Sequence, residues 1–290
     1  MDSSVLWCGT LWSKSVEERL EAADAGGFTE VSIFPTDIAE FAEEPYHEEF
    51  PDADSPESAI RSLAADYEAD VTIFDPFVQW VPDWSPPDPD AVPPLFDTDE
   101  DELFRRGDAL GIDSLTVLEP FGETLGPAAA ATAFGRLCDR AADHGWRVHL
   151  EFIPFTGIPD LATAWDIVER ADRDNGGLLF DTWHFYRGTA DEELLRTIPG
   201  EKIYRVQVAD APAESQYALR EESLHHRRLP GEGDLNLLSP IRTLDDIGGL
   251  NSVGIEVISD DLDERPATEI GTRCRASLDD LLASAGVDAV

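Results

Sequence analysis

Short apolar runs rich in β-branched residues alternate with polar stretches of helical periodicity along the chain. The runs have the length of buried strands, and we expect strands at residues 5–11, 30–34, 70–74, 114–119, 148–153, 178–181, 204–210 and 253–258. Several of the stretches between them begin at Ser, Asp or Pro and end at Gly, as capped helices do. The pattern therefore predicts an alternation of strand and helix throughout.

This alternation predicts the fold class. Strands buried on both faces and separated by helices favour a parallel sheet. Eight such units in 290 residues fit an α/β fold of the closed (β/α)8 TIM barrel type better than an open doubly wound sheet. No shift in composition marks a second domain, so we expect a single TIM-barrel domain over residues 1–290. The longest irregular stretches, residues 75–97 and 211–236, have the length of lids or binding loops.

Reactive side chains stand at the ends of four successive predicted strands. They lie 30, 26 and 49 residues apart and are Glu151, Asp181, Gln207 and Glu256. The C-terminal strand ends of a (β/α)8 barrel form one rim, so these side chains should converge. A carboxylate in so apolar a strand is costly unless a cation compensates it. Three carboxylates and a carboxamide are hard oxygen donors, which favours a Mg²⁺ or Mn²⁺ site.

Each of these residues, taken alone, also has a simpler structural interpretation. An Asp at a strand end is often a helix cap, and Asp181 can cap the turn that follows it. His184 should lie on the same rim and contact substrate, although a lone histidine is commonly satisfied within the core. His149 is expected either to be structural or to support a neighbouring ligand from behind. Residues 225–228 read HHRR, a cationic patch suited to a carboxylate, phosphate or hydroxyl-rich ligand.

Longer motifs around these positions resemble a known family. They are HLEFIPFTGIPDLATAWDIV, GGLLFDTWHF, VQVADAP, RRLPGEGDLNL and GIEV. Along nearly the whole chain the sequence resembles the xylose isomerase-like TIM barrel superfamily of sugar phosphate isomerases and epimerases, which includes ketose 3-epimerases, inosose isomerases and 3-dehydroshikimate dehydratases. The resemblance implies one divalent metal ion, held by Glu151, Asp181, Gln207 and Glu256.

The resemblance also implies roles in binding and catalysis. His184 and Arg227 match positions that usually contact substrate oxygens in this family. Glu151 and Glu256 would act as the catalytic acid and base on opposite faces of the substrate. Ketose epimerases typically have His where this chain has Gln207, and some dehydratases of the superfamily have a carboxamide there.

Three functions follow from this resemblance. The first is isomerisation or epimerisation of a ketose, inosose or related polyhydroxy-carbonyl compound, by proton abstraction through an enediolate. The second is metal-dependent dehydration of a 3-dehydroshikimate or keto-inositol type of substrate, in which the enolate expels a β-hydroxyl group. The third is a non-catalytic sugar-binding or partner-subunit barrel, which retention of all the metal-site positions disfavours.

The charge of the chain bears on its partners and its environment. It has 61 acidic residues against 21 basic ones, a formal net charge of -40, and the acids are spread along the sequence. We expect a halophilic origin, since high salt screens such self-repulsion. Nucleic acid and membrane surfaces are disfavoured as partners. The dispersed cysteines and the lack of a leader or an apolar span predict a cytoplasmic protein, and a homo-oligomer stays open.

Overall fold

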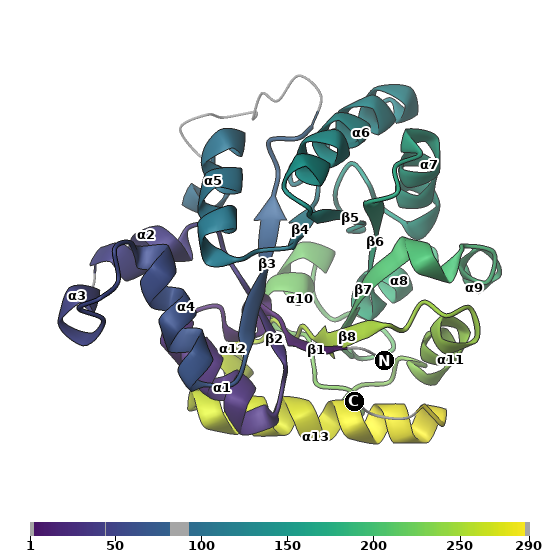
Figure 1. The fold of residues 1–290 in the computed structure, drawn as a ribbon. Helices are drawn as coiled ribbons and strands as arrows, with labels where there is room; N and C mark the ends of the chain where they lie inside the picture. The colour runs from purple at the N-terminus through teal and green to yellow at the C-terminus, as the bar shows by residue number, and fades with distance from the viewer. Residues whose placement is uncertain (1–2, 44, 82–92, 288–290) are drawn as a thin grey trace.

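Eight parallel strands form a closed barrel in chain order in the computed structural model, which describes residues 3–43, 45–81 and 93–287 (Figure 1). β1 pairs with β8 and closes the sheet. The predicted TIM barrel is confirmed. The strands are β1 (Ser3–Leu6), β2 (Glu30–Ile33), β3 (Asp70–Phe77), β4 (Ser114–Val117), β5 (Arg147–Glu151), β6 (Gly176–Asp181), β7 (Ile203–Val208) and β8 (Ser252–Ile255).

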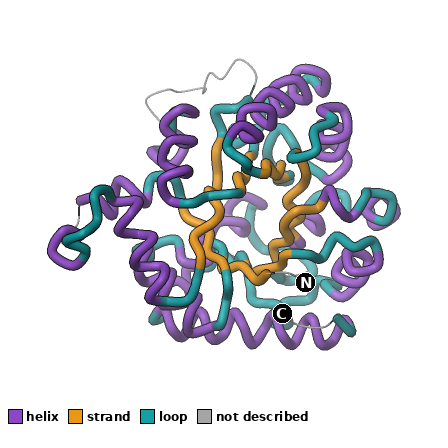
Figure 2. The backbone as a smooth tube through the Cα atoms, in the orientation of Figure 1, coloured by secondary structure: helices purple, strands orange, loops and turns teal. Residues whose placement is uncertain are grey.

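Helices surround this ring of strands (Figure 2). The longer ones are α1 (Val16–Gly26), α4 (Pro56–Asp66), α5 (Glu100–Leu110), α6 (Pro127–Asp143), α7 (Leu161–Ala171), α11 (Leu238–Asp246) and α13 (Ala267–Ala285). Shorter segments are η1 (Cys8–Leu11), α2 (Asp37–Glu43), α3 (Tyr46–Glu49), η3 (Pro94–Phe96), α8 (Thr182–Arg187), α9 (Glu192–Leu195), η4 (Gly200–Lys202), α10 (Leu219–His225) and α12 (Asp260–Asp263). Within the described ranges, no helix has the length and apolarity that crossing a bilayer demands.

α1 shows how the sequence signals set helix ends and packing. Ser15 and Glu18 form a reciprocal capping box at its start, with bonds of 3.2 and 2.9 Å. Gly27 ends the helix at φ +65°, a conformation that glycine adopts without steric cost. α13 lies directly against α1: a Cβ at Gly271 would come within 1.8 Å of the Ala22 carbonyl oxygen. The helices that flank β1 and β8 are thus in backbone contact where the barrel closes.

The first predicted strand, residues 5–11, is wrong beyond Leu6. Cys8–Leu11 instead forms the 3-10 turn η1. The chain leaves the sheet there because side chains satisfy its polar groups: the Cys8 amide donates to Ser32 Oγ at 2.8 Å, and Thr10 Oγ1 donates to the Ile255 carbonyl at 3.0 Å.

The two predicted long loops also differ from expectation. Of residues 75–97, the segment 82–92 lies outside the described residues, while β3 continues to Phe77. Residues 211–236 are not wholly irregular, because α10 lies within them. Of its two leucines, Leu224 lines a cavity of the site and Leu219 packs against the core, so the helix lacks the continuous apolar stripe that usually signals an outer helix.

The barrel interior is tightly filled. Val5, Trp7, Ile73 and Leu179 form a small apolar cluster inside the ring, separate from the larger core between strands and helices. His149 is fully buried, and its Nε2 lies 2.8 Å from Ser114 Oγ. This placement agrees with the structural role expected for His149.

The carboxylate of Asp210 organises the loop that follows β7. Its Oδ1 accepts from the amides of Ala211 (2.8 Å) and Leu235 (3.1 Å), and its Oδ2 accepts from those of Gly231 (3.0 Å) and Gly233 (3.1 Å). A Cβ at Gly233 would lie 2.3 Å from Asp210 Oδ1, so the loop needs glycine for this close approach. The LPGEGD motif therefore folds around a buried carboxyl group.

We expect Asp210→Ala to lower the free energy of unfolding by about 2–4 kcal/mol, because it leaves several amides without an acceptor. Chemical denaturation measures the change. Asp234→Ala is the matched control, since Asp234 accepts a single long bond of 3.4 Å from the Ala213 amide at the surface. Equal stability of the two variants would show that the loop does not depend on Asp210.

Candidate active site

The four side chains predicted to converge stand at the C-terminal ends of neighbouring strands. Glu151 and Asp181 are the last residues of β5 and β6, Gln207 is the last but one of β7, and Glu256 directly follows β8. All four are buried. The sheet register places Asp181 opposite Gln207, so the two side chains occupy adjacent strand ends.

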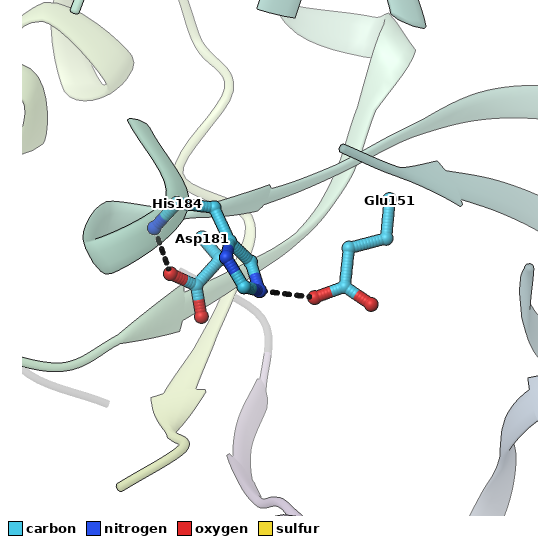
Figure 3. A group of neighbouring side chains, drawn as sticks. All are labelled: Glu151, Asp181 and His184. Carbon is cyan, nitrogen blue, oxygen red and sulfur yellow. Dashed lines mark hydrogen bonds and ion pairs between the residues drawn. The ribbon is translucent and has the colours of Figure 1, made fainter. Parts of the chain in front are cut away.

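His184 joins two of these carboxyl groups (Figure 3). Its Nε2 lies 3.2 Å from Glu151 Oε1, and its backbone amide donates to Asp181 Oδ1 at 2.8 Å. Asp181 is therefore the N-cap of α8, the structural interpretation considered for it, while its second oxygen, Oδ2, faces the other charged groups of the site. One potential ligand atom from each of Glu151, Asp181 and His184 lies within 4.8 Å of the others.

Arg227 brings a buried positive charge to this cluster. Its Nη1 donates to Asp181 Oδ2 at 2.8 Å and to Glu256 Oε2 at 3.3 Å. Its Nη2 lies 3.3 Å from His184 Nε2. Since a guanidinium only donates, His184 Nε2 must accept, and a bond from Glu151 to the same nitrogen requires protonated Glu151.

The backbone on either side of Arg227 fixes its position. His226 pairs with Ser259, and Arg228 pairs with Asp210, in short antiparallel bridges. The Arg227 amide donates to the Ile258 carbonyl at 3.1 Å. The segment is thus held between the extensions of β7 and β8, and the Arg227 side chain points into the barrel mouth.

Gln207 is the least satisfied side chain of the site. It is fully buried, and neither Oε1 nor Nε2 has a hydrogen-bond partner among the described residues. Buried polar groups are normally paired, and an unpaired one costs free energy. A ligand beside Asp181 would give this carboxamide a partner.

Burial shifts the protonation of the site. It raises the pKa of Glu151 to about 8, assisted by the charge of Asp181, and it raises the pKa of Glu256 well above its usual value against the opposing effect of Arg227. Burial also lowers the pKa of His184 to about 4, although the charge of Asp181 acts in the other direction. Glu151 is therefore mostly protonated and His184 neutral at pH 7, so neither group carries a charge across their 3.2 Å contact.

Asp75 belongs to the same site and was missed by the sequence analysis. It lies in β3, is buried, and faces the cavity with Glu151 and Glu256. Burial, with a smaller contribution from the charge of Glu151, raises its pKa well above the usual value. A signal was present, because Asp75 follows VTIF just as Asp181 follows LLF.

A cavity of about 130 Å³ opens over these groups. Asp75, Glu151, His184, Arg227 and Glu256 form its polar floor. Its walls are largely apolar and include Trp12, Phe34, Phe96, Leu118, Phe155 and Ile258. Flat apolar walls over a polar floor suit a compact ring with its reactive oxygens at one edge.

The predicted cationic patch at residues 225–228 does not form one site. Arg227 alone points inward, whereas His225 pairs with Asp260 at 3.0 Å and His226 stacks on Tyr217 at a centroid distance of 3.8 Å. Arg228 donates to the Glu232 carbonyl at 3.1 Å. The neighbours of Arg227 therefore make surface contacts around it.

The raised carboxyl pKa values predict that the metal-free protein becomes less stable as the pH rises from 6.5 to 8. In this range the folded state keeps the Glu151 proton that the unfolded chain has lost, so the free energy of unfolding falls by up to about 1.4 kcal/mol per pH unit for each such group. His184, with a folded pKa of about 4, is neutral in both states above pH 6.5 and contributes stability that is lost only as the pH falls further.

Denaturant titrations with a chelator at several pH values check this. We expect Glu151→Gln to reduce the slope of the free energy of unfolding against pH by the equivalent of up to one bound proton. Glu193→Gln, on the exposed surface, should leave this slope unchanged. A slope that is identical in the wild type and Glu151→Gln would contradict the protonation assigned to Glu151.

Fold and site together define a (β/α)8 barrel with a buried acidic pocket at its C-terminal rim, the location of active sites in TIM barrel enzymes. The chain belongs to the xylose isomerase-like TIM barrel family, whose model matches residues 20–278. Known members of this family that resemble the chain are enzymes, among them a dehydratase and isomerases.

Two curated relatives and one solved structure illustrate the similarity. The chain is 30% identical over 251 residues to 3-dehydroshikimate dehydratase of Pseudomonas aeruginosa, which covers 86% of this chain and 37% of that protein. It is 32% identical over 132 residues to inosose isomerase of Bacillus licheniformis, covering 45% of this chain and 46% of that one. The IolI protein, solved with a bound zinc atom, shares the fold at a TM-score of 0.75 and 17% identity, over 97% of this chain and 98% of that one.

The similarity to the curated relatives is partial in length. The match spans 37% of the Pseudomonas aeruginosa dehydratase and 46% of the inosose isomerase, well under two thirds of either protein.

Proposed function

We propose that the protein is a divalent-metal-dependent dehydratase that removes water from a cyclic hydroxy ketone of the 3-dehydroshikimate type. The observation that carries this proposal is the pair of buried carboxyl groups, Glu151 and Glu256, on the floor of one cavity. Elimination needs a base for one proton and an acid for the leaving hydroxyl group. The similarity to 3-dehydroshikimate dehydratase, which extends over 86% of the chain, and the carboxamide at Gln207 favour dehydration.

The donor set fits a divalent metal ion. Glu151, Asp181, Gln207 and Glu256 would hold it, as the family resemblance implies, and the unpaired Gln207 Oε1 is a buried oxygen that needs a partner. These oxygen donors favour Mn²⁺ or Mg²⁺, while the IolI protein was solved with zinc. When bound, such an ion supplies a Lewis acid that polarises the substrate carbonyl.

We expect Gln207→Leu to weaken Mn²⁺ binding by about tenfold or more. The same change removes an unpaired buried amide, so it should raise the stability of the metal-free protein. Calorimetric titration of metal into chelator-treated protein measures the affinity. Gln216→Leu, an exposed substitution of the same kind, should change neither quantity, and an unaltered affinity in Gln207→Leu would exclude this residue as a ligand.

The residues of the chain divide the reaction between them. Glu151, which coordination of the divalent ion would deprotonate, removes the proton from the carbon next to the carbonyl group. Glu256, held by Arg227 at 3.3 Å, gives a proton to the departing β-hydroxyl group. A C–H bond and a C–O bond break, a C=C bond forms and water leaves, with no change of oxidation state overall. His184 and Arg227 orient the substrate oxygens.

Glu151→Gln and Glu256→Gln should each lower kcat for 3-dehydroshikimate by about 10²–10⁴-fold, because each removes one proton-transfer group. The rise in ultraviolet absorbance of the conjugated product reports the rate. Glu221→Gln, an exposed change on α10, should keep wild-type activity. Full activity in either site variant would end the catalytic assignment of that residue.

Isomerisation or epimerisation of an inosose or ketose is the second candidate. The specific observation in its favour is the 32% identity to inosose isomerase. In this case the second carboxyl group returns a proton to carbon instead of to a leaving group. Incubation with an inosose in deuterium oxide distinguishes the two: deuterium in recovered substrate without loss of water favours isomerisation, and formation of a conjugated ketone favours dehydration.

A further inference from the structure

Arg220 stands apart from the other arginines of the protein. Within residues 3–43, 45–81 and 93–287, it is the one arginine with no hydrogen bond, ion pair or ring contact to another residue. It is exposed, yet it lines the cavity above the acidic floor. In a chain with a net charge of -40, an unpaired guanidinium beside the cavity is a suitable binding group for an anionic ligand.

The local structure directs Arg220 toward the site. Arg220, Ser223 and Leu224 line the cavity at the spacing i, i+3 and i+4 of one face of α10, and Arg227, two residues after the helix, lines it as well. Arg220 lies in the first turn of α10. The two arginines therefore place one guanidinium at the mouth of the cavity and one at its floor.

The guanidinium groups of Arg227 and Arg220 differ in the partners that they bind. Arg227 is buried and bound to Asp181, Glu256 and Ser223, so its charge is balanced within the protein. Arg220 has no such partner among the residues that the structure describes. An anionic substrate that approaches the floor meets the carboxyl groups there, and Arg220 is the cavity-lining cation whose charge is free to offset their repulsion.

We propose that Arg220 binds the carboxylate of an acidic ring substrate and so selects it over uncharged polyhydroxy ketones. A guanidinium matches a carboxylate with two parallel hydrogen bonds. The largely apolar walls between mouth and floor leave the ring itself few polar contacts, so the two ends of the substrate fix its orientation. This inference rests on the proposed function, because it assigns the carboxylate of the 3-dehydroshikimate type of substrate to the mouth of the same cavity.

A pair of ligands that differ in one group tests the role of Arg220. Loss of water from 3-dehydroshikimate gives 3,4-dihydroxybenzoate, and catechol is the same ring without the carboxylate. We expect Mn²⁺-loaded wild-type protein to bind 3,4-dihydroxybenzoate about tenfold or more tightly than catechol in calorimetric titrations. Arg220→Gln should abolish this preference and leave catechol binding unchanged, whereas Arg220→Lys should keep part of it.

Arg228→Gln is the matched control, since Arg228 lies in the same segment but does not line this cavity. It should retain the wild-type preference. In turnover, Arg220→Gln should raise KM for 3-dehydroshikimate about tenfold and change kcat by less than about twofold, since Arg220 contacts the part of the substrate that does not react.

The outcomes separate this inference from the proposed function. Equal binding of the two ligands by the wild type, or an undiminished preference in Arg220→Gln, would overturn the role of Arg220 even if 3-dehydroshikimate is dehydrated. Loss of the preference in Arg220→Gln without any turnover of 3-dehydroshikimate would support the carboxylate site and reject the dehydratase. Failure of the wild type to bind either ligand would overturn both.

Discussion

The ion pairs of Arg227 are the interaction on which the arrangement of the site depends. A permanent positive charge lies between Asp181 and Glu256, both buried at the rim of the barrel. Removing one partner of a buried pair leaves the other charge without compensation, at a cost of about 3–5 kcal/mol. The backbone bridges of residues 226 and 228 keep Arg227 in place, so the loop after β7 and the extension of β8 are structural parts of the site.

Most of the fold and part of the site could be predicted from the sequence. Apolar runs indicate strands because strands buried on both faces show no alternation of polar and apolar residues. A carboxylate at the end of such an apolar run, as at Asp181, is therefore easily recognised. Asp75 has the same pattern but was assigned to the loop after β3, since the strand was expected to end at residue 74. Boundaries are set by tertiary hydrogen bonds, such as that from Cys8 to Ser32, which the local pattern does not contain.

The electrostatics of the site could not be predicted in the same way. The contact between Arg227 and Asp181 joins positions 46 residues apart, and it depends on how the loop folds around Asp210. That Gln207 and Arg220 have no partner within the described part of the chain is likewise a property of the assembled structure. The residue type shows that a side chain can bind a metal or carry a charge. Whether that side chain already has a hydrogen-bond or ion-pair partner within the protein depends on the packing of the folded chain.

The contact between α1 and α13 has a consequence for the order in which the site assembles. It joins helices that flank β1 and β8, so the barrel closes only when segments more than 200 residues apart in the sequence meet. Closure of such long loops is slow relative to local helix formation. Arg227 and Glu256 come from the segments that complete the ring, whereas Glu151 and Asp181 belong to strands that precede them, so the site is complete only once the ring has closed.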